Sequence, residues 1–164
     1  MAEGSLPPLL LVGCGKMGGA MLTGWLEQGL RRAVVVEPNP EAAARFAGRA
    51  TVVAEAAQVP PDLRPAAVIL AIKPQEAGTA LPAYARLAGP ETVFLSIMAG
   101  RTVAGMRALL GAGAAVVRAM PNTPAAVRQG FTVAFAGPGV TAAQRDLADR
   151  LLAAVGEVAW VEQE

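Results

Sequence analysis

The residues best suited to chemistry form a glycine loop, Gly13-Cys14-Gly15-Lys16-Met17-Gly18, directly after the apolar run Leu9–Val12. In a G-x-G-x-x-G loop the first glycine permits a tight turn, the second lets the backbone approach a diphosphate, and the third lets the next helix pack closely on the sheet. The amino end of that helix offers free N–H groups and a positive dipole to phosphates. The loop therefore predicts a dinucleotide site that includes Val12 and residues 13–18. A glycine-rich turn that only packs is the alternative.

Two other readings of the loop fit less well. A mononucleotide P-loop has a different spacing, and here Lys16 is followed by Met17, which has no hydroxyl for magnesium. Cys14 occupies the variable slot between two glycines, and we expect it to be a small filler rather than a redox thiol.

Glu37 is the candidate residue for binding the adenosine ribose of the cofactor. It ends the apolar run Ala33–Val36, about 20 residues after the loop. A carboxylate there can accept hydrogen bonds from both adenosine-ribose hydroxyls and would repel a 2′-phosphate. No arginine lies at positions 38–41, so the sequence favours NADH over NADPH, although Asn39 could still bind a phosphate. A Glu37 that is only solvated at a strand end is the alternative.

The elements around these residues alternate between strand and helix. Short, uniformly apolar runs are typical of strands buried on both faces, and they occur at Leu9–Val12, Ala33–Val36, Ala67–Ile72, Thr92–Ile97 and Ala114–Val117. Helices are predicted at Lys16–Gln28, Asn39–Phe46, Gln75–Leu87 (shortened or kinked by Pro82), Thr102–Leu110 and Thr141–Val155, with strands at Phe131–Phe135 and Val158–Val161. This rhythm predicts an α/β, Rossmann-like, doubly wound and mainly parallel sheet with helices on both faces.

Composition narrows the functions. A chain of 164 residues is expected to form one domain, 1–164, with residues 1–8 as a flexible arm. A net charge of +1 argues against nucleic acid, and the apolar runs are too short to span a membrane. Histidine is absent and Cys14 is the single cysteine, so we expect no metal site and no His-based catalysis. The single cysteine and the lack of a signal peptide suit a cytoplasmic protein.

Three further segments follow expected strands and would therefore meet at the carboxyl edge of the sheet. They are Ala71-Ile72-Lys73-Pro74-Gln75, Ser96-Ile97-Met98-Ala99-Gly100 and Arg118-Ala119-Met120-Pro121-Asn122-Thr123-Pro124. With the glycine loop, this series closely resembles the N-terminal dinucleotide-binding domain of the pyrroline-5-carboxylate reductase family, from about Leu9 to Val161. The resemblance implies reduction of the C=N bond of 1-pyrroline-5-carboxylate to L-proline, the last step of proline biosynthesis, with NADPH or NADH.

The resemblance also implies roles for individual residues. It implies that Val12–Met17 hold the diphosphate and that Glu37, Pro38 and Asn39 contact the adenosine ribose. The path to the nicotinamide would be lined by Ala71, Ile72, Lys73, Pro74, Ile97, Met98 and Ala99, with Gly100 and Asn122 close to the substrate. Lys73 is a plausible cation for cofactor or substrate oxygens, and a lysine that only snorkels at a strand end is its alternative.

The chain departs from the family pattern in two ways. Family members continue into an all-helical domain that forms the dimer and supplies a Ser/Gly-rich loop for the substrate carboxylate, and no such segment occurs here. We therefore assign no catalytic residue within the chain and expect a homo-oligomer of the full-length form through that further domain. Members that prefer NADPH commonly carry a small hydroxyl residue where Glu37 stands.

Two other functions stay open. One is a stand-alone dinucleotide-binding or oligomerisation module without catalysis. The other is a β-hydroxyacid dehydrogenase, whose Gly-x-Gly-x-Met-Gly loop is similar, although the segment at 121–124 argues against it.

Overall fold

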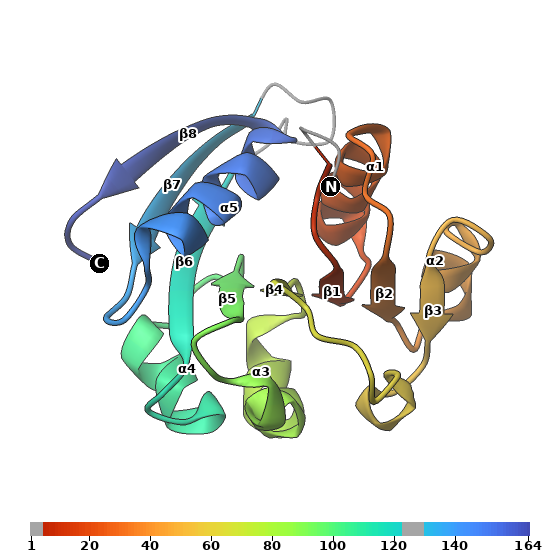
Figure 1. Ribbon diagram of the computed structural model, residues 1–164, viewed down its shortest axis with the longest axis horizontal. Helices are drawn as coiled ribbons and strands as arrows, with labels where there is room; N and C mark the ends of the chain where they lie inside the picture. The colour runs from red at the N-terminus through yellow and green to blue at the C-terminus, as the bar shows by residue number, and fades with distance from the viewer. Residues whose placement is uncertain (1–4, 123–129) are drawn as a thin grey trace.

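A computed structural model describes residues 5–122 and 130–164. Its described strands form one sheet with helices packed on both faces (Figure 1). The strands are β1 (Leu9–Val12), β2 (Ala33–Val36), β3 (Thr51–Val53), β4 (Ala67–Leu70), β5 (Val93–Ser96), β6 (Ala115–Pro121), β7 (Gly130–Ala136) and β8 (Gly156–Val161). The α-helices are α1 (Lys16–Glu27), α2 (Pro40–Ala44), α3 (Ala77–Ala80), α4 (Val103–Leu110) and α5 (Ala142–Ala153), and the 3₁₀ helices are η1 (Ala56–Gln58), η2 (Pro74–Glu76) and η3 (Leu81–Leu87).

The strand order is β3-β2-β1-β4-β5-β6-β7-β8. All neighbours are parallel except β6 and β7, which pair antiparallel. The chain builds outward from β1 in one direction through β2 and β3, and then in the other from β4, so the order reverses between β1 and β4. A doubly wound sheet binds ligands at the carboxyl ends of the strands at this reversal. The predicted Rossmann-like, mainly parallel sheet is confirmed.

Each central strand contributes to two cores, which explains why its sequence is uniformly apolar. Leu9 and Leu11 of β1 pack with residues of α1 and α5, while Leu10 and Val12 pack on the other face with residues of α3, η3 and α4. Successive strand side chains point to opposite faces, so both must be apolar when helices cover both. The buried Trp25 ring lies between the helices of the first face, where its Nε1 donates to the Leu151 carbonyl at 2.9 Å.

The helix starts follow the expected caps. Asn39 Oδ1 accepts from the Glu41 amide at 2.9 Å at the start of α2, and Thr141 and Gln144 form the predicted capping box of α5. The predicted helix Gln75–Leu87 is instead divided into η2, α3 and η3, with Pro82 in η3. Proline lacks the N–H that a continuous α-helix would use, so the chain tightens into 3₁₀ turns there.

Three further segments differ from the sequence-based expectation. β3 has only three residues, and Thr51 is exposed, so it leaves no uniformly apolar run. β6 continues to Pro121, because its second half pairs with β7 from Val117 opposite Ala136 onward. Of the expected flexible arm, residues 1–4 lie outside the described part, while Leu6 is buried and Pro8 accepts a backbone hydrogen bond from Ala66.

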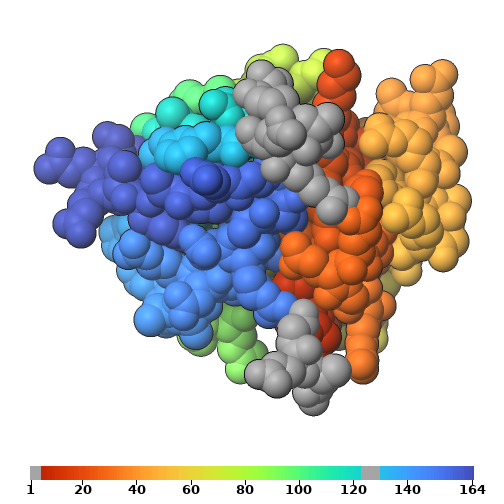
Figure 2. Space-filling view, turned by 90° about the horizontal axis from the view of Figure 1, so that it is seen from above, coloured from red at the N-terminus to blue at the C-terminus, as the bar shows by residue number. Residues whose placement is uncertain are grey.

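The two edges of the sheet lie at opposite ends of the molecule. Figure 2 shows the segment around residues 40–60 at one end and the last residues at the other. Within residues 5–122 and 130–164, no helix is long and apolar enough to cross a bilayer.

Candidate functional site

A cleft of about 1040 Å³ opens at the carboxyl ends of β1, β2, β3 and β4. It lies beside the reversal in strand order, where ligands bind in this fold. The predicted site residues that line it are Val12, Gly13, Cys14, Gly15, Glu37, Pro38, Asn39, Ala71, Ile72 and Lys73. A smaller hollow of about 590 Å³ lies at the opposite edge, between segments 61–65 and 86–92, and contains none of the predicted residues. The larger cleft is therefore the candidate site.

The glycine loop between β1 and α1 forms one wall of this cleft, and its geometry needs glycine. Gly13 has φ +90°, and a Cβ there would lie 2.6 Å from the Ala71 carbonyl oxygen. A Cβ on Gly18 would lie 2.6 Å from the Gly13 carbonyl oxygen, so the loop and α1 could not close together. Gly15 differs, since a Cβ there would have no atom within 4 Å. The loop is therefore tightly packed at Gly13 and Gly18, and it leaves open space at Gly15.

The amino end of α1 fits a diphosphate. Gly15 is the N-cap, no side chain caps the helix, and no acidic residue lies in its first turn. The first amides of a helix have no intrahelical partner and carry a partial positive charge, which attracts anions. Lys16, exposed at this helix start, adds a formal positive charge. The open space above Gly15 would let a diphosphate approach the backbone.

Glu37 holds the glycine loop against β2. Its Oε1 accepts from the Cys14 amide at 2.7 Å, and its Oε2 accepts from the Asn39 amide at 3.0 Å. The carboxylate is thereby fixed in the cleft wall between the loop and the start of α2, next to Pro38. Carboxylate–amide bonds of this kind are charge-assisted and stronger than neutral ones. Sequence reasoning expected Glu37 at this edge but did not anticipate its bond to the loop.

The Cys14 and Met17 side chains of the loop pack in or against the protein core. The Cys14 thiol is buried in the core with β1 and α1, and burial raises its pKa to about 11. It is therefore protonated at neutral pH, and a thiol rather than a thiolate is a poor nucleophile. Met17 is partly buried against the same core. These positions support the expectation that Cys14 fills space.

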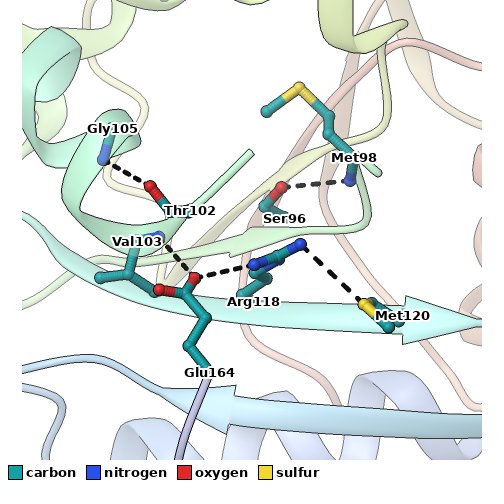
Figure 3. A network of polar contacts seen from close by, with 8 residues as sticks. All are labelled: Ser96, Met98, Thr102, Val103, Gly105, Arg118, Met120 and Glu164. Atoms are coloured by element: carbon teal, nitrogen blue, oxygen red, sulfur yellow. Dashed lines mark hydrogen bonds and ion pairs between the residues drawn. The ribbon is translucent and has the colours of Figure 1, made fainter. Parts of the chain in front are cut away.

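The loop after β4 lines the cleft, and the loop after β5 lies next to it along the same edge of the sheet. The Ala71 amide donates to the Val12 carbonyl at 2.8 Å, which joins the loop after β4 to the end of β1. Arg101 Nε donates to the Pro74 carbonyl at 2.9 Å, which joins the loop after β5 to the loop after β4. The segment Ile97–Gly100 does not line the cleft. Ser96 Oγ accepts from the Met98 amide at 3.1 Å (Figure 3), and the Met98 side chain is buried, whereas Ala99 and Gly100 are exposed.

At the end of β6 the described polar side chains are engaged with the protein itself. Asn122 Oδ1 accepts from the Phe131 amide at 2.7 Å, which joins the residue after β6 to β7. Arg118 pairs with Glu164 at 3.1 Å, and the same Glu164 oxygen accepts from the Val103 amide at 2.7 Å (Figure 3). The expected site segment continues to Thr123 and Pro124, which lie outside the described residues.

Sequence reasoning missed the wall of the cleft that faces the glycine loop. The residues not anticipated come from η2, α3 and η3 and include Glu76, Thr79, Ala83 and Tyr84, and Glu55 of the segment after β3 lies beside them. They follow no motif, because alanines and a single tyrosine in a broken helix carry no recognisable spacing. In the described part of the chain, no group of three or more Cys, Asp or Glu side chains could hold a metal ion.

Comparisons with known proteins agree with this fold. Residues 9–100 match the family model described as NADP oxidoreductase, coenzyme F420-dependent. A pyrroline-5-carboxylate reductase from Pseudomonas aeruginosa is 37% identical over 164 residues, which cover 98% of this chain and 59% of that protein. The structure of a pyrroline-5-carboxylate reductase from Coxiella burnetii has a TM-score of 0.87 at 27% identity and covers 96% of this chain and 60% of its own.

A prephenate dehydrogenase from A. aeolicus has a TM-score of 0.80 at 16% identity, covering 98% of this chain and 61% of its own, which shows a shared fold only. The fold therefore does not select a substrate.

The strand order, the glycine loop and the edge cleft define a Rossmann-type α/β domain. The chain belongs to the family of NADP oxidoreductases described as coenzyme F420-dependent. The resemblance to the N-terminal domain of pyrroline-5-carboxylate reductases is also confirmed. The chain spans less than two thirds of the length of these relatives.

Proposed function

We propose that the cleft binds NAD(P)H with its diphosphate over Gly15 and the amino end of α1. The open space at Gly15, the uncapped helix start and the adjacent Lys16 support this position. The adenosine ribose lies by Glu37, Pro38 and Asn39, and the chain from ribose to nicotinamide follows Ala71, Ile72, Lys73 and Pro74. The nicotinamide then reaches the exposed backbone of Ala99 and Gly100, with Ile97 and Met98 as its support from below.

We further infer a preference for NADH over NADPH. The two Glu37 oxygens are held by the Cys14 and Asn39 amides, so the carboxylate cannot turn away from a nucleotide without losing both bonds. A fixed negative charge accepts the hydrogen bonds of ribose hydroxyls and repels a 2′-phosphate.

The reaction proposed for the whole protein is the reduction of 1-pyrroline-5-carboxylate to L-proline. When bound, the reduced nicotinamide supplies a hydride to the imine carbon, and a proton added to the nitrogen gives the amine. The residues of this chain orient the ring, through Pro74 and the loop Ile97–Gly100, which Arg101 ties together. We assign no proton donor within residues 1–164. Asn122 is proposed near the substrate by position along the edge, with its side-chain oxygen already bound to the Phe131 amide.

The relatives' names support this substrate. Because the chain spans 59% of the P. aeruginosa relative, we propose that the substrate-carboxylate site and the homo-oligomer contact belong to residues of the full-length protein outside this chain. A cytoplasmic location is proposed on the single, buried cysteine, which suits a reducing compartment.

The observation that carries the proposal is the open, uncapped glycine loop at the reversal of strand order. A steady-state assay of the full-length protein with pyrroline-5-carboxylate and NADH or NADPH, beside a calorimetric titration of each cofactor into the chain, tests it. Turnover supports the reductase. Cofactor binding in the micromolar range without turnover would favour a binding module, and binding of neither cofactor would refute the proposal.

A further inference from the structure

Tyr84 is the one tyrosine of the chain, and its environment is unusual for a residue without an assigned role. It belongs to η3, is only 4% exposed, and packs in the core with Val12 and Val36. Among the described residues, nothing donates to or accepts from its hydroxyl. Buried polar groups are usually hydrogen-bonded, so a hydroxyl without a partner needs an explanation.

The hydroxyl is not sealed inside the protein. Within the described part of the chain, the buried side-chain nitrogen or oxygen atoms that lack a partner are the Nε atoms of Arg107 and Arg118, and the Tyr84 oxygen is not among them. Tyr84 lines the cleft that also contains the glycine loop and Glu37. The little surface that Tyr84 exposes is therefore assigned to the cleft.

The wall around Tyr84 suits a flat, uncharged group. Its neighbours along the cleft include Ala56, Ala80 and Ala83, which leave room for a ring. Glu55 and Glu76 lie in the same wall, and their negative charges disfavour phosphate there. The phosphate-attracting end of the cleft is the start of α1, which packs on the other face of the sheet from Tyr84. A dinucleotide with its diphosphate on the loop would direct its base toward Tyr84.

We propose that Tyr84 is a specificity residue for the cofactor's base, and that its hydroxyl hydrogen-bonds an edge of the adenine ring. This rests on the proposed function of the cleft. Adenine offers ring nitrogens as acceptors and an amino group as a donor, and a tyrosine hydroxyl can serve either. Burial raises the pKa of Tyr84 to about 12, so the hydroxyl keeps its proton at neutral pH.

The test is calorimetric titration of the chain with NADH, with ADP-ribose and with nicotinamide mononucleotide. Tyr84→Phe removes only the hydroxyl and should weaken NADH and ADP-ribose binding by about threefold to tenfold, the equivalent of one hydrogen bond. Nicotinamide mononucleotide, which lacks adenine, should bind wild type and variant alike. Equal ADP-ribose affinity in wild type and Tyr84→Phe would overturn the proposal while leaving the cofactor site intact. If wild-type protein binds neither NADH nor ADP-ribose, the proposed function itself fails.

A second pair of variants tests the proposal even if the Tyr84→Phe variant does not fold correctly. Ala83→Leu adds bulk at an exposed position that lines the cleft, and should weaken ADP-ribose binding more than tenfold. Ala143→Leu adds the same bulk at an exposed position of α5, outside the cleft, and should leave ADP-ribose affinity unchanged. Full ADP-ribose affinity in Ala83→Leu would show that the base does not lie in this wall and would overturn the proposal.

Discussion

The Cys14 amide donates a hydrogen bond of 2.7 Å to the Glu37 carboxylate, which joins the glycine loop to the end of β2. The second oxygen of the same carboxylate accepts from the Asn39 amide, at the cap of α2. One acidic side chain thus fixes both the loop expected to hold the diphosphate and the segment expected to hold the ribose. We therefore predict that cofactor affinity and cofactor choice are coupled through Glu37.

Replacing Glu37 should change cofactor preference. Glu37→Ser removes the charge that repels a 2′-phosphate, so the ratio of NADPH to NADH affinity should rise by about tenfold, or about 1.4 kcal/mol. Titration calorimetry with both cofactors measures the ratio. Glu41→Ser is the matched control, because Glu41 is an exposed acid in the first turn of α2 that does not line the cleft. A ratio unchanged in Glu37→Ser, or equally changed in Glu41→Ser, would contradict the ribose assignment.

Valine substitutions at two glycines of the loop should affect different properties, one cofactor affinity and the other thermal stability. Gly15→Val meets open space within the protein, so its Tm should stay close to that of wild type while its NADH affinity falls at least tenfold. Gly13→Val meets the Ala71 carbonyl at a positive φ, so it should unfold at a clearly lower temperature. Thermal unfolding and NADH titration of both variants separate the effects. An NADH affinity in Gly15→Val equal to that of wild type would argue against a diphosphate at this loop.

Stability should fall in alkaline solution. Burial raises the pKa of Cys14 from 9.0 to about 11 and that of Tyr84 from 10.0 to about 12. The folded chain thus holds these protons more tightly than the unfolded chain does. Their contribution to the free energy of unfolding is full below about pH 9 and declines as pH rises through 11 and 12. Urea unfolding between pH 8 and pH 12 should show this decline, and Cys14→Ala should flatten the part between pH 9 and pH 11. A decline of equal slope in the variant would contradict the role of Cys14.

The ion pair of Arg118 and Glu164 should be worth more than an exposed pair. Its side chains are 16% and 24% exposed, and the Glu164 carboxylate also accepts from the Val103 amide at the start of α4. A double-mutant cycle with Arg118→Met and Glu164→Ala should give a coupling free energy of about 1 kcal/mol. The matched control is Arg32 with Asp62, whose side chains are 42% and 74% exposed and whose coupling should be close to zero. Equal coupling in the two cycles would show that Glu164 does not hold β6 to α4.

Sequence patterns predicted the fold well where a single local rule decides the structure. The buried strands are recognisable because both of their faces are covered, and Asn39 and Thr141 mark helix starts because their side chains satisfy free amides. Patterns were weaker where pairing between distant segments decides. β6 extends past Val117 only because β7 returns beside it, and no feature of residues 118–121 alone indicates this.

The candidate site divides in the same way. The glycine loop and Glu37 follow a spacing that the chemistry of a diphosphate and a ribose imposes, and both line the cleft. Tyr84 and its neighbouring alanines have no such spacing, since a wall for a flat base needs only small residues and space. The bond from Cys14 to Glu37 also escapes sequence reasoning, because it depends on how closely the loop approaches β2.

The central claim is that the glycine loop receives the diphosphate of a dinucleotide. Amide chemical shifts recorded while ADP-ribose is titrated into the ¹⁵N-labelled chain test it most directly. We predict saturable shifts at Gly13, Gly15, Lys16 and Asn39, with β8 unaffected. Saturable shifts confined to β7 and β8, or no shifts at any concentration of ADP-ribose, would contradict the claim.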